Sequence, residues 1–229
     1  MSFPITGISS MATKGLLAEL AQAYEQRSGR TVAIEAVGGV DAAKRVQAGE
    51  PFDVVVLASD AIDKLLATGH LAAGSKVDLV RSGVSVAVRA GALRPDIGSE
   101  EALKRAVLAA RTVGYSTGPS GVQLAKLFER WGIAEQLRER IVTAPPGVPV
   151  GALVARGEVE LGFQQLSELM HLEGIDVLGP LPEPVQIVTT FSAGVGAKAA
   201  QPDAARALLD YMASPAADAA KRRQGMTAA

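Results

Sequence analysis

Cysteine is absent from the 229 residues of this sequence. Its absence excludes disulfide bonds, thiolate metal sites and cysteine nucleophiles. An excess of charge of one sign is also lacking, because 23 basic and 24 acidic residues give a formal net charge of -1. The chain therefore has no global field that would attract nucleic acid or an anionic membrane. A charged ligand would have to be bound by local groups.

Targeting features and long apolar runs are missing as well. The first residues, MSFPITG, lack the basic region, the apolar run and the small-residue cleavage site of a secretory signal. No apolar run elsewhere is long enough to span a bilayer. We expect the chain as written to be cytoplasmic, or periplasmic if a signal sequence has been removed, and to be a monomer without a nucleic-acid partner.

Motifs for catalysis and metal binding are scarce. G-x-S-x-G does not occur, so the sequence has no nucleophile elbow. The two histidines, His70 and His171, and the scattered carboxylates show no metal-ligand spacing, and we expect neither a metal nor a cofactor. Each histidine is more simply a surface residue or a charge partner at a helix C-terminus. The short KRR run at 221–223 also suits a helix end better than a nucleic-acid patch.

Alternating strand and helix patterns are what the sequence does contain. The segment DVVVLAS at 53–59 is a nearly continuous apolar run, as expected when helices cover both faces of a parallel sheet. The segment DAIDKLLATG follows as a helix, with Asp60 as its expected N-cap and Gly69 at its end. The first third of the chain therefore predicts an open α/β sheet built from repeated βα units.

A second block of strands and helices begins at the segment SGVSVAVRAG. It includes a helix from about residue 121 to residue 131, and the chain closes with a helical tail in two pieces, broken near Pro215. We expect two lobes. Lobe one comprises residues 1–82 and 193–229, lobe two comprises residues 83–192, and β-like hinges lie near residues 81–86 and 188–194.

Two strand-to-helix turns in the first block are rich in small residues. Ser9 and Ser10 end the first strand, where free N–H groups and the helix dipole favour an anion, although plain N-capping explains serines equally well. Gly39 opens the next helix and lets a backbone approach closely. The alternative there is a helix capped by Asp41, with an i,i+4 ion pair between Asp41 and Arg45.

A third turn of this kind is the segment YSTGPSG at 115–121. Its hydroxyls and backbone N–H groups could again be presented to an anion. Three such turns, if they converge, would form an uncharged cage of hydrogen-bond donors.

The order of these segments resembles the molybdate-binding protein family of ABC importers. The likeness covers nearly the whole chain and rests on the serine turn, AAKRVQAGEPFDVVVLAS, GPSG, ALVARGEVELGF and ASPAADAAKRRQGM. It implies the α/β, two-lobed type II periplasmic-binding-protein fold, in which each lobe is an open mixed sheet flanked by helices and the ligand cleft lies between the lobes. It also implies the membrane subunit of an ABC importer as a candidate partner.

The resemblance implies a tetrahedral oxyanion held by two serines, backbone N–H groups and a tyrosine hydroxyl. Ser10 matches the first serine, and Ser120 matches the small residue of the third turn. The remaining family donors have no match, because Gly39, Gly147 and Gln165 stand at or near their positions. Such a rebuilt cage suits a di- or tricarboxylate better than a bare oxyanion. The predicted ligand-binding residues are Ser9, Ser10, Gly39, Thr117, Ser120, Gly147 and Gln165, with Lys14 and Arg45 as charge partners.

Two functions remain open at this point. The favoured one is a small-anion-binding protein whose lobes close around the ligand by hinge motion, because the turns offer donors and no acid/base pair can be identified. The alternative is a metal-independent isomerase of a tricarboxylate, because some relatives of this family resemble aconitate isomerase. That chemistry needs a positioned base, for which Asp41, Lys14 and Tyr115 are the candidates.

Overall fold

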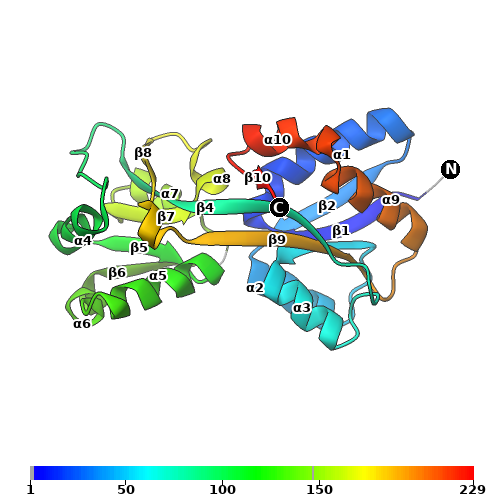
Figure 1. Ribbon diagram of the computed structural model, residues 1–229, viewed down its shortest axis with the longest axis horizontal. Coiled ribbons are helices and arrows are strands. Elements are labelled where there is room, and N and C mark those ends of the chain that lie inside the picture. Colours follow the sequence, from blue (N-terminus) through cyan, green and yellow to red (C-terminus); the bar gives the residue numbers. More distant parts are fainter. Residues whose placement is uncertain (1–2, 146) are drawn as a thin grey trace. The chain divides into compact units, whose positions relative to one another are not determined.

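The computed structural model describes residues 3–145 and 147–229 as two compact units (Figure 1). The first unit comprises Met1–Ser82 and Thr189–Ala229, and the second comprises Gly83–Val188. Strand β4 (Val77–Arg89) runs from the first unit into the second, and β9 (Val188–Val195) runs back. The expected α/β class, with mixed sheets flanked by helices, is confirmed.

The sheet of the first unit has the strand order β2-β1-β3-β9-β4. Strand β1 lies between β2 and β3 and is parallel to both, whereas β9 is antiparallel to β3 and the short β10 is antiparallel to β4. The strands that have not yet been bounded are β1 (Ile5–Ser10), β2 (Val32–Val37), β3 (Val54–Ala58) and β10 (Thr227–Ala228).

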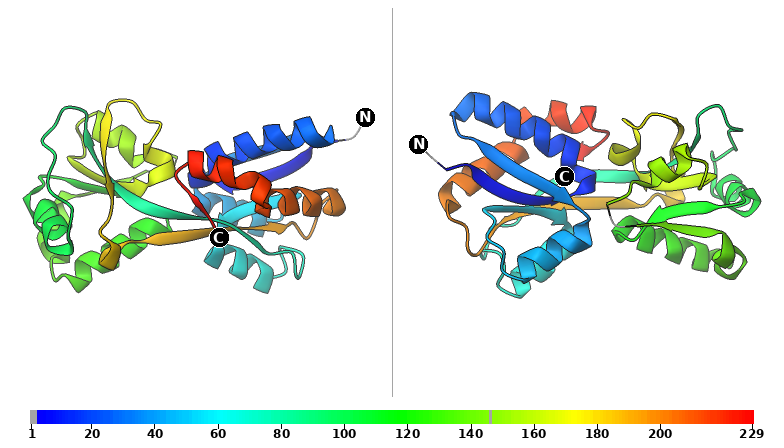
Figure 2. Two further views of the ribbon diagram at one scale, coloured as in Figure 1. Left: turned by 45° about the horizontal axis from the view of Figure 1, so that its top comes forward. Right: turned by 180° about the vertical axis from the view of Figure 1, so that it is seen from behind.

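Helices cover both faces of this sheet (Figures 1 and 2). Helices α1, α9 and α10 cover one face, and α2 and α3 cover the other. Their bounds are η1 (Met11–Thr13), α1 (Lys14–Ser28), α2 (Gly39–Gln47), α3 (Ser59–Ala67), α9 (Pro202–Ala213), η4 (Pro215–Ala217) and α10 (Asp218–Arg223). The expected break of the C-terminal tail near Pro215 is confirmed.

The apolar run of β3 follows from burial of both of its faces, because successive side chains of a strand point to opposite faces. Val54 and Val56 pack into the core under α1 and α9, whereas Val55 and Leu57 pack into the core under α2 and α3. The prediction that Asp60 caps α3 is wrong. Helix α3 begins at Ser59, with Ala58 as its N-cap, so the Asp60 carboxylate lies in the first turn, where it complements the helix dipole.

The sheet of the second unit has the order β4-β7-β5-β6, and β8 also pairs with β4. Strands β5, β6 and β7 are parallel, and β4 is antiparallel to β7 and β8. The new strands are β5 (Val113–Ser116), β6 (Ile141–Ala144), β7 (Leu161–Gln165) and β8 (Ile175–Pro180). The helices are α4 (Glu100–Ala109), α5 (Pro119–Arg130), α6 (Ala134–Leu137), η2 (Arg138–Arg140), α7 (Val150–Ala155), α8 (Leu166–Leu169) and η3 (Glu183–Val185).

Helix α5 begins at Pro119, two residues earlier than predicted, because proline suits the first helical position. Its first turn packs closely against the end of β5. A Cβ atom on Gly121 would lie 1.8 Å from the Ser116 carbonyl oxygen, so only glycine fits there. Among the described residues, no helix is both long and apolar enough to cross a membrane.

Candidate functional site

In the first unit, the carboxyl ends of β1, β2 and β3 meet at one edge of the sheet, because the three strands are parallel. Ligands of open α/β sheets bind outside this kind of edge. Strand β1 ends at Ser10, and Gly39 opens α2 directly after β2. These two residues are neighbours, since a Cβ atom on Gly39 would lie 3.5 Å from the Ser10 Cβ.

The Ser10 side chain is buried without a hydrogen-bond partner. The residue is 7% exposed, and its Oγ is the one fully buried side-chain nitrogen or oxygen of the described residues that has no partner. Ser10 precedes η1 with extended backbone angles, yet its side chain makes no capping hydrogen bond. The interpretation of Ser10 as a side-chain helix cap is therefore wrong. A buried unpaired hydroxyl costs about 1–3 kcal/mol, which marks Ser10 as a candidate ligand donor.

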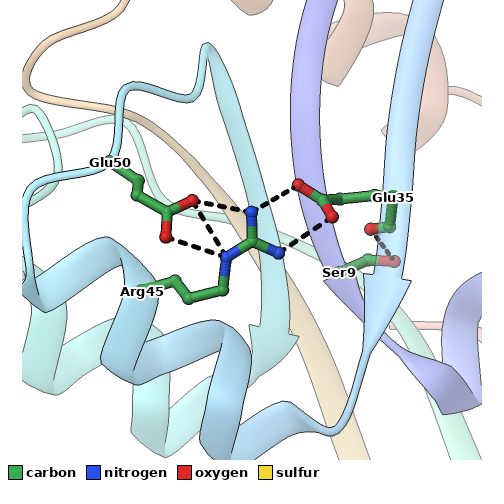
Figure 3. Close-up of polar contacts among 4 residues, drawn as sticks. All are labelled: Ser9, Glu35, Arg45 and Glu50. Atoms are coloured by element: carbon green, nitrogen blue, oxygen red, sulfur yellow. Dashed lines mark hydrogen bonds and ion pairs between the residues drawn. The ribbon is translucent and has the colours of Figure 1, made fainter.

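The neighbouring hydroxyl of Ser9 has a different environment. Ser9 is fully buried, and its Oγ donates to the Glu35 carbonyl oxygen on β2 over 3.3 Å (Figure 3). The hydroxyl therefore joins two strands of the sheet, and its donation to a ligand stays a prediction.

Arg45 lies between two carboxylates (Figure 3). Its Nη1 and Nη2 each donate to Glu35 over 2.8 Å, while Nε and Nη2 donate to Glu50 over 2.6–3.0 Å. The pairing lowers the pKa of Glu50 and raises that of Arg45. Both bidentate edges of the guanidinium are occupied by Glu35 and Glu50, and pairing of Arg45 with a ligand stays a prediction.

The other charged candidates of the first unit lie apart from these contacts. The expected ion pair between Asp41 and Arg45 is wrong, because Asp41 Oδ1 lies 3.9 Å from Lys44 Nζ and Arg45 binds Glu35 and Glu50. Lys14 is exposed at the start of α1, where it lines a groove of about 350 Å³ between α1 and β2.

In the second unit, the carboxyl ends of β5, β6 and β7 also meet at one edge, followed by α5, α7 and α8. Thr117 is exposed in the turn before α5, and Ser120 is half-buried in the first helical turn. Gly147 has a φ of 77°, in a turn that precedes α7. Gln165 ends β7, is 3% exposed and lies opposite Val84 of β4.

Two polar residues at this edge, Gln164 and Glu168, are not predicted from the sequence. Gln164 is buried, and its Oε1 accepts hydrogen bonds from the N–H groups of Val150, over 2.8 Å, and Gly151, over 3.4 Å. Its Nε2 donates to Oε2 of Glu168. Burial raises the pKa of Glu168 to about 7. No sequence pattern marks this pair, because Gln164 lies in a strand and Glu168 in the helix that follows, and their burial cannot be inferred from the sequence.

Tyr115 does not suit the role of base. Burial raises its pKa, and the ring packs edge-on against Phe128 with centroids 6.2 Å apart. The phenol is therefore neutral near neutral pH.

The remaining polar candidates have structural partners. His70 Nε2 lies 3.1 Å from the carbonyl oxygen of Gln47 at the C-terminal end of α2, as expected for a helix-end partner. Lys221, the first residue of the KRR run, is buried and lies 3.4 Å from Asp218 on the same helix. Within residues 3–145 and 147–229, no group of three or more histidine, aspartate or glutamate residues is placed to hold a metal ion.

Comparison with known proteins gives related sequences along nearly the whole chain. The chain is 43% identical over 225 residues to an aconitate isomerase of a Pseudomonas species, covering 95% of this chain and 84% of the relative. It is 27% identical over 183 residues to the molybdate-binding protein ModA of Azotobacter vinelandii, covering 76% of this chain and 69% of the relative.

The fold matches solved structures of the same kind. The structure of the periplasmic molybdate-binding protein of Azotobacter vinelandii matches with a TM-score of 0.82 at 21% identity, covering 98% of this chain and 99% of that one. The family described as bacterial extracellular solute-binding protein matches residues 5–227. Since this match spans almost the whole sequence, the chain belongs to the bacterial extracellular solute-binding protein family and has the type II periplasmic-binding-protein fold of its molybdate-binding relatives.

Proposed function

We propose that this protein binds an aconitate-like tricarboxylate and moves its double bond by proton transfer. The observation that carries ligand binding is the buried, unpartnered hydroxyl of Ser10 at the carboxyl edge of β1. The substrate class follows from the relative named aconitate isomerase, which is 43% identical over 95% of this chain.

The residues around these edges favour an organic carboxylate over a compact oxyanion. Gly39 has no side-chain donor beside Ser10, and Gln165 carries a long amide where the molybdate-binding pattern has a phenol. A donor set of the wrong size leaves buried polar groups unpaired, which weakens the binding of a small tetrahedral anion. Serine hydroxyls and helix N–H groups, such as those opening α5, instead suit planar carboxylates.

The proposed reaction changes no oxidation state. In aconitate, the CH₂ carbon next to a carboxylate loses a proton to a base, and the C–H electron pair delocalises through the double bond. The same proton, or one from solvent, then adds to the former vinylic carbon. The double bond has moved by one carbon and no other bond has changed, so one acid/base group and donors for the intermediate charge are sufficient.

The second candidate is binding without chemistry, which the family match over residues 5–227 favours. In that case the ligand would pass to the membrane subunit of an importer, and the protein would act outside the cytoplasmic membrane. This candidate predicts the same ligands and no turnover.

A thermal-shift panel followed by proton NMR tests both candidates. The panel contains molybdate, tungstate, sulfate, phosphate, citrate, cis-aconitate and trans-aconitate, because a ligand at 100 times its Kd stabilises the folded state by about 2.7 kcal/mol. We expect stabilisation by the aconitates, and conversion of one isomer into the other in the vinylic region of the spectrum. Stabilisation by molybdate alone would refute the tricarboxylate proposal. Stabilisation by aconitate without conversion would leave the binding protein as the function.

A further inference from the structure

Glu168 is not among the glutamates of the described chain that pair with an arginine. Glu19, Glu35, Glu50, Glu100, Glu135, Glu158 and Glu160 each pair with an arginine. Glu168 instead accepts a hydrogen bond from an uncharged amide, that of Gln164. A carboxyl group that is partly buried without a cation keeps its proton to a higher pH than an exposed one.

The amide of Gln164 has one orientation available. The N–H groups of Val150 and Gly151, at the start of α7, both point to Oε1 of Gln164. Since N–H groups cannot accept, this side of the amide must be the oxygen, and Nε2 must face Glu168. The start of α7 therefore fixes one carboxyl oxygen of Glu168 through the Gln164 side chain.

The contact with Gln164 orients the Glu168 carboxyl group. The Gln164 amide donates to Oε2 of Glu168. Glu168 is partly buried and lies in α8, which directly follows the carboxyl end of β7.

We propose that Glu168 is the acid/base residue of the isomerisation and that Gln164 is its positioning residue. This inference rests on the proposed isomerase function. The carboxylate of ionised Glu168 takes the proton from the CH₂ carbon of the tricarboxylate, and the resulting carboxylic acid returns a proton to the former vinylic carbon. Glu168 is ionised again at the end, and no oxidant or reductant is needed.

The surroundings of Glu168 agree with this role. Burial raises its pKa to about 7, which is the value that suits a group exchanging protons near neutral pH. Helix α8 packs through Leu169 against Gly151 of α7 and follows β7, and neither α7 nor β7 contains a titratable residue. Glu168 is the titratable residue of α8, and the next ones along the chain, His171 and Glu173, are exposed.

The test compares Glu168→Gln with Glu160→Gln in the full chain. Glu160 precedes the same strand at its opposite end, where it pairs with Arg111. We expect Glu168→Gln to lower the rate of aconitate conversion at least 100-fold, the usual contribution of a general acid/base, while aconitate still raises the Tm. Glu160→Gln should convert aconitate at the wild-type rate.

The dependence of the conversion rate on pH distinguishes a positioning role of Gln164 from a purely structural one. The rate of the wild type should fall as pH drops below about 7, because protonated Glu168 cannot accept a proton. The bond from Gln164 opposes the rise in this pKa, so Gln164→Met should move the profile to higher pH. An unmoved profile would refute the positioning role.

The two proposals fail differently. Conversion by wild type and by Glu168→Gln at similar rates would overturn the assignment of Glu168 and leave the isomerase intact. Binding of aconitate without conversion by the wild type would overturn both.

Discussion

Replacing Ser10 with alanine should stabilise the free protein and weaken its ligand complex. In the free protein the Ser10 hydroxyl is buried without a partner, so its desolvation is uncompensated. Such a group destabilises the folded state by about 1–3 kcal/mol. Taking the lower end, Ser10→Ala should raise the free energy of unfolding by about 1 kcal/mol and the Tm by roughly 2–4 °C for a chain of this size.

The ligand complex should respond in the opposite direction. A hydrogen bond from a hydroxyl to a charged carboxylate contributes about 1.5–3 kcal/mol, so its loss should raise the Kd roughly 10- to 150-fold. Urea unfolding measures the first effect, and isothermal titration with trans-aconitate, citrate or whichever tricarboxylate the panel identifies measures the second.

Ser9→Ala is the matched control, because the two serines are adjacent on β1 and both are buried. Ser9 donates to the Glu35 carbonyl oxygen, so its replacement should lower the free energy of unfolding by about 0.5–1.5 kcal/mol and leave the Kd unchanged. The reasoning would be refuted if Ser10→Ala destabilised the free protein while the Kd stayed at the wild-type value.

Three further predictions follow from the contacts described above. Gly121→Ala should destabilise the fold by about 3 kcal/mol in urea unfolding, because its Cβ would meet the Ser116 carbonyl oxygen at 1.8 Å, whereas Gly118→Ala meets Ser116 Oγ at 3.5 Å and should be tolerated. Arg45→Gln should leave the ligand Kd unchanged and make stability less dependent on salt, and a large loss of affinity would return Arg45 to the site. Glu168 binds its proton more tightly in the folded state, so the free energy of unfolding should fall by about 3 kcal/mol as pH rises from 4.5 to 7. In urea titrations at several pH values, Glu168→Gln should flatten that part of the stability curve.

The α/β architecture could be predicted because its signals are local. Strand β3 is apolar throughout because helices cover both of its faces. Proline and glycine mark the start of α5 because each favours the backbone conformation required there. The distinction between Ser9 and Ser10 is not local. It depends on which hydroxyl reaches a carbonyl oxygen of β2, and therefore on how β1 aligns with β2.

The same limit applies to charged residues. Arg45 was expected to pair within its helix, yet Glu35 comes from β2 and Glu50 from the loop before β3. Glu168 carries no special sequence signal, because its pKa is set by the burial that α7, α8 and β7 create together.

Strand β3 also has a consequence for how the first unit opens. Its side chains belong alternately to the two cores, and both of its edges are paired, with β1 on one side and β9 on the other. Neither helical layer can detach without exposing part of this strand to water. The amide protons of Val55 and Val56 should therefore exchange with deuterium only through unfolding of the entire unit, so β3 couples the two layers into a single cooperative foldon.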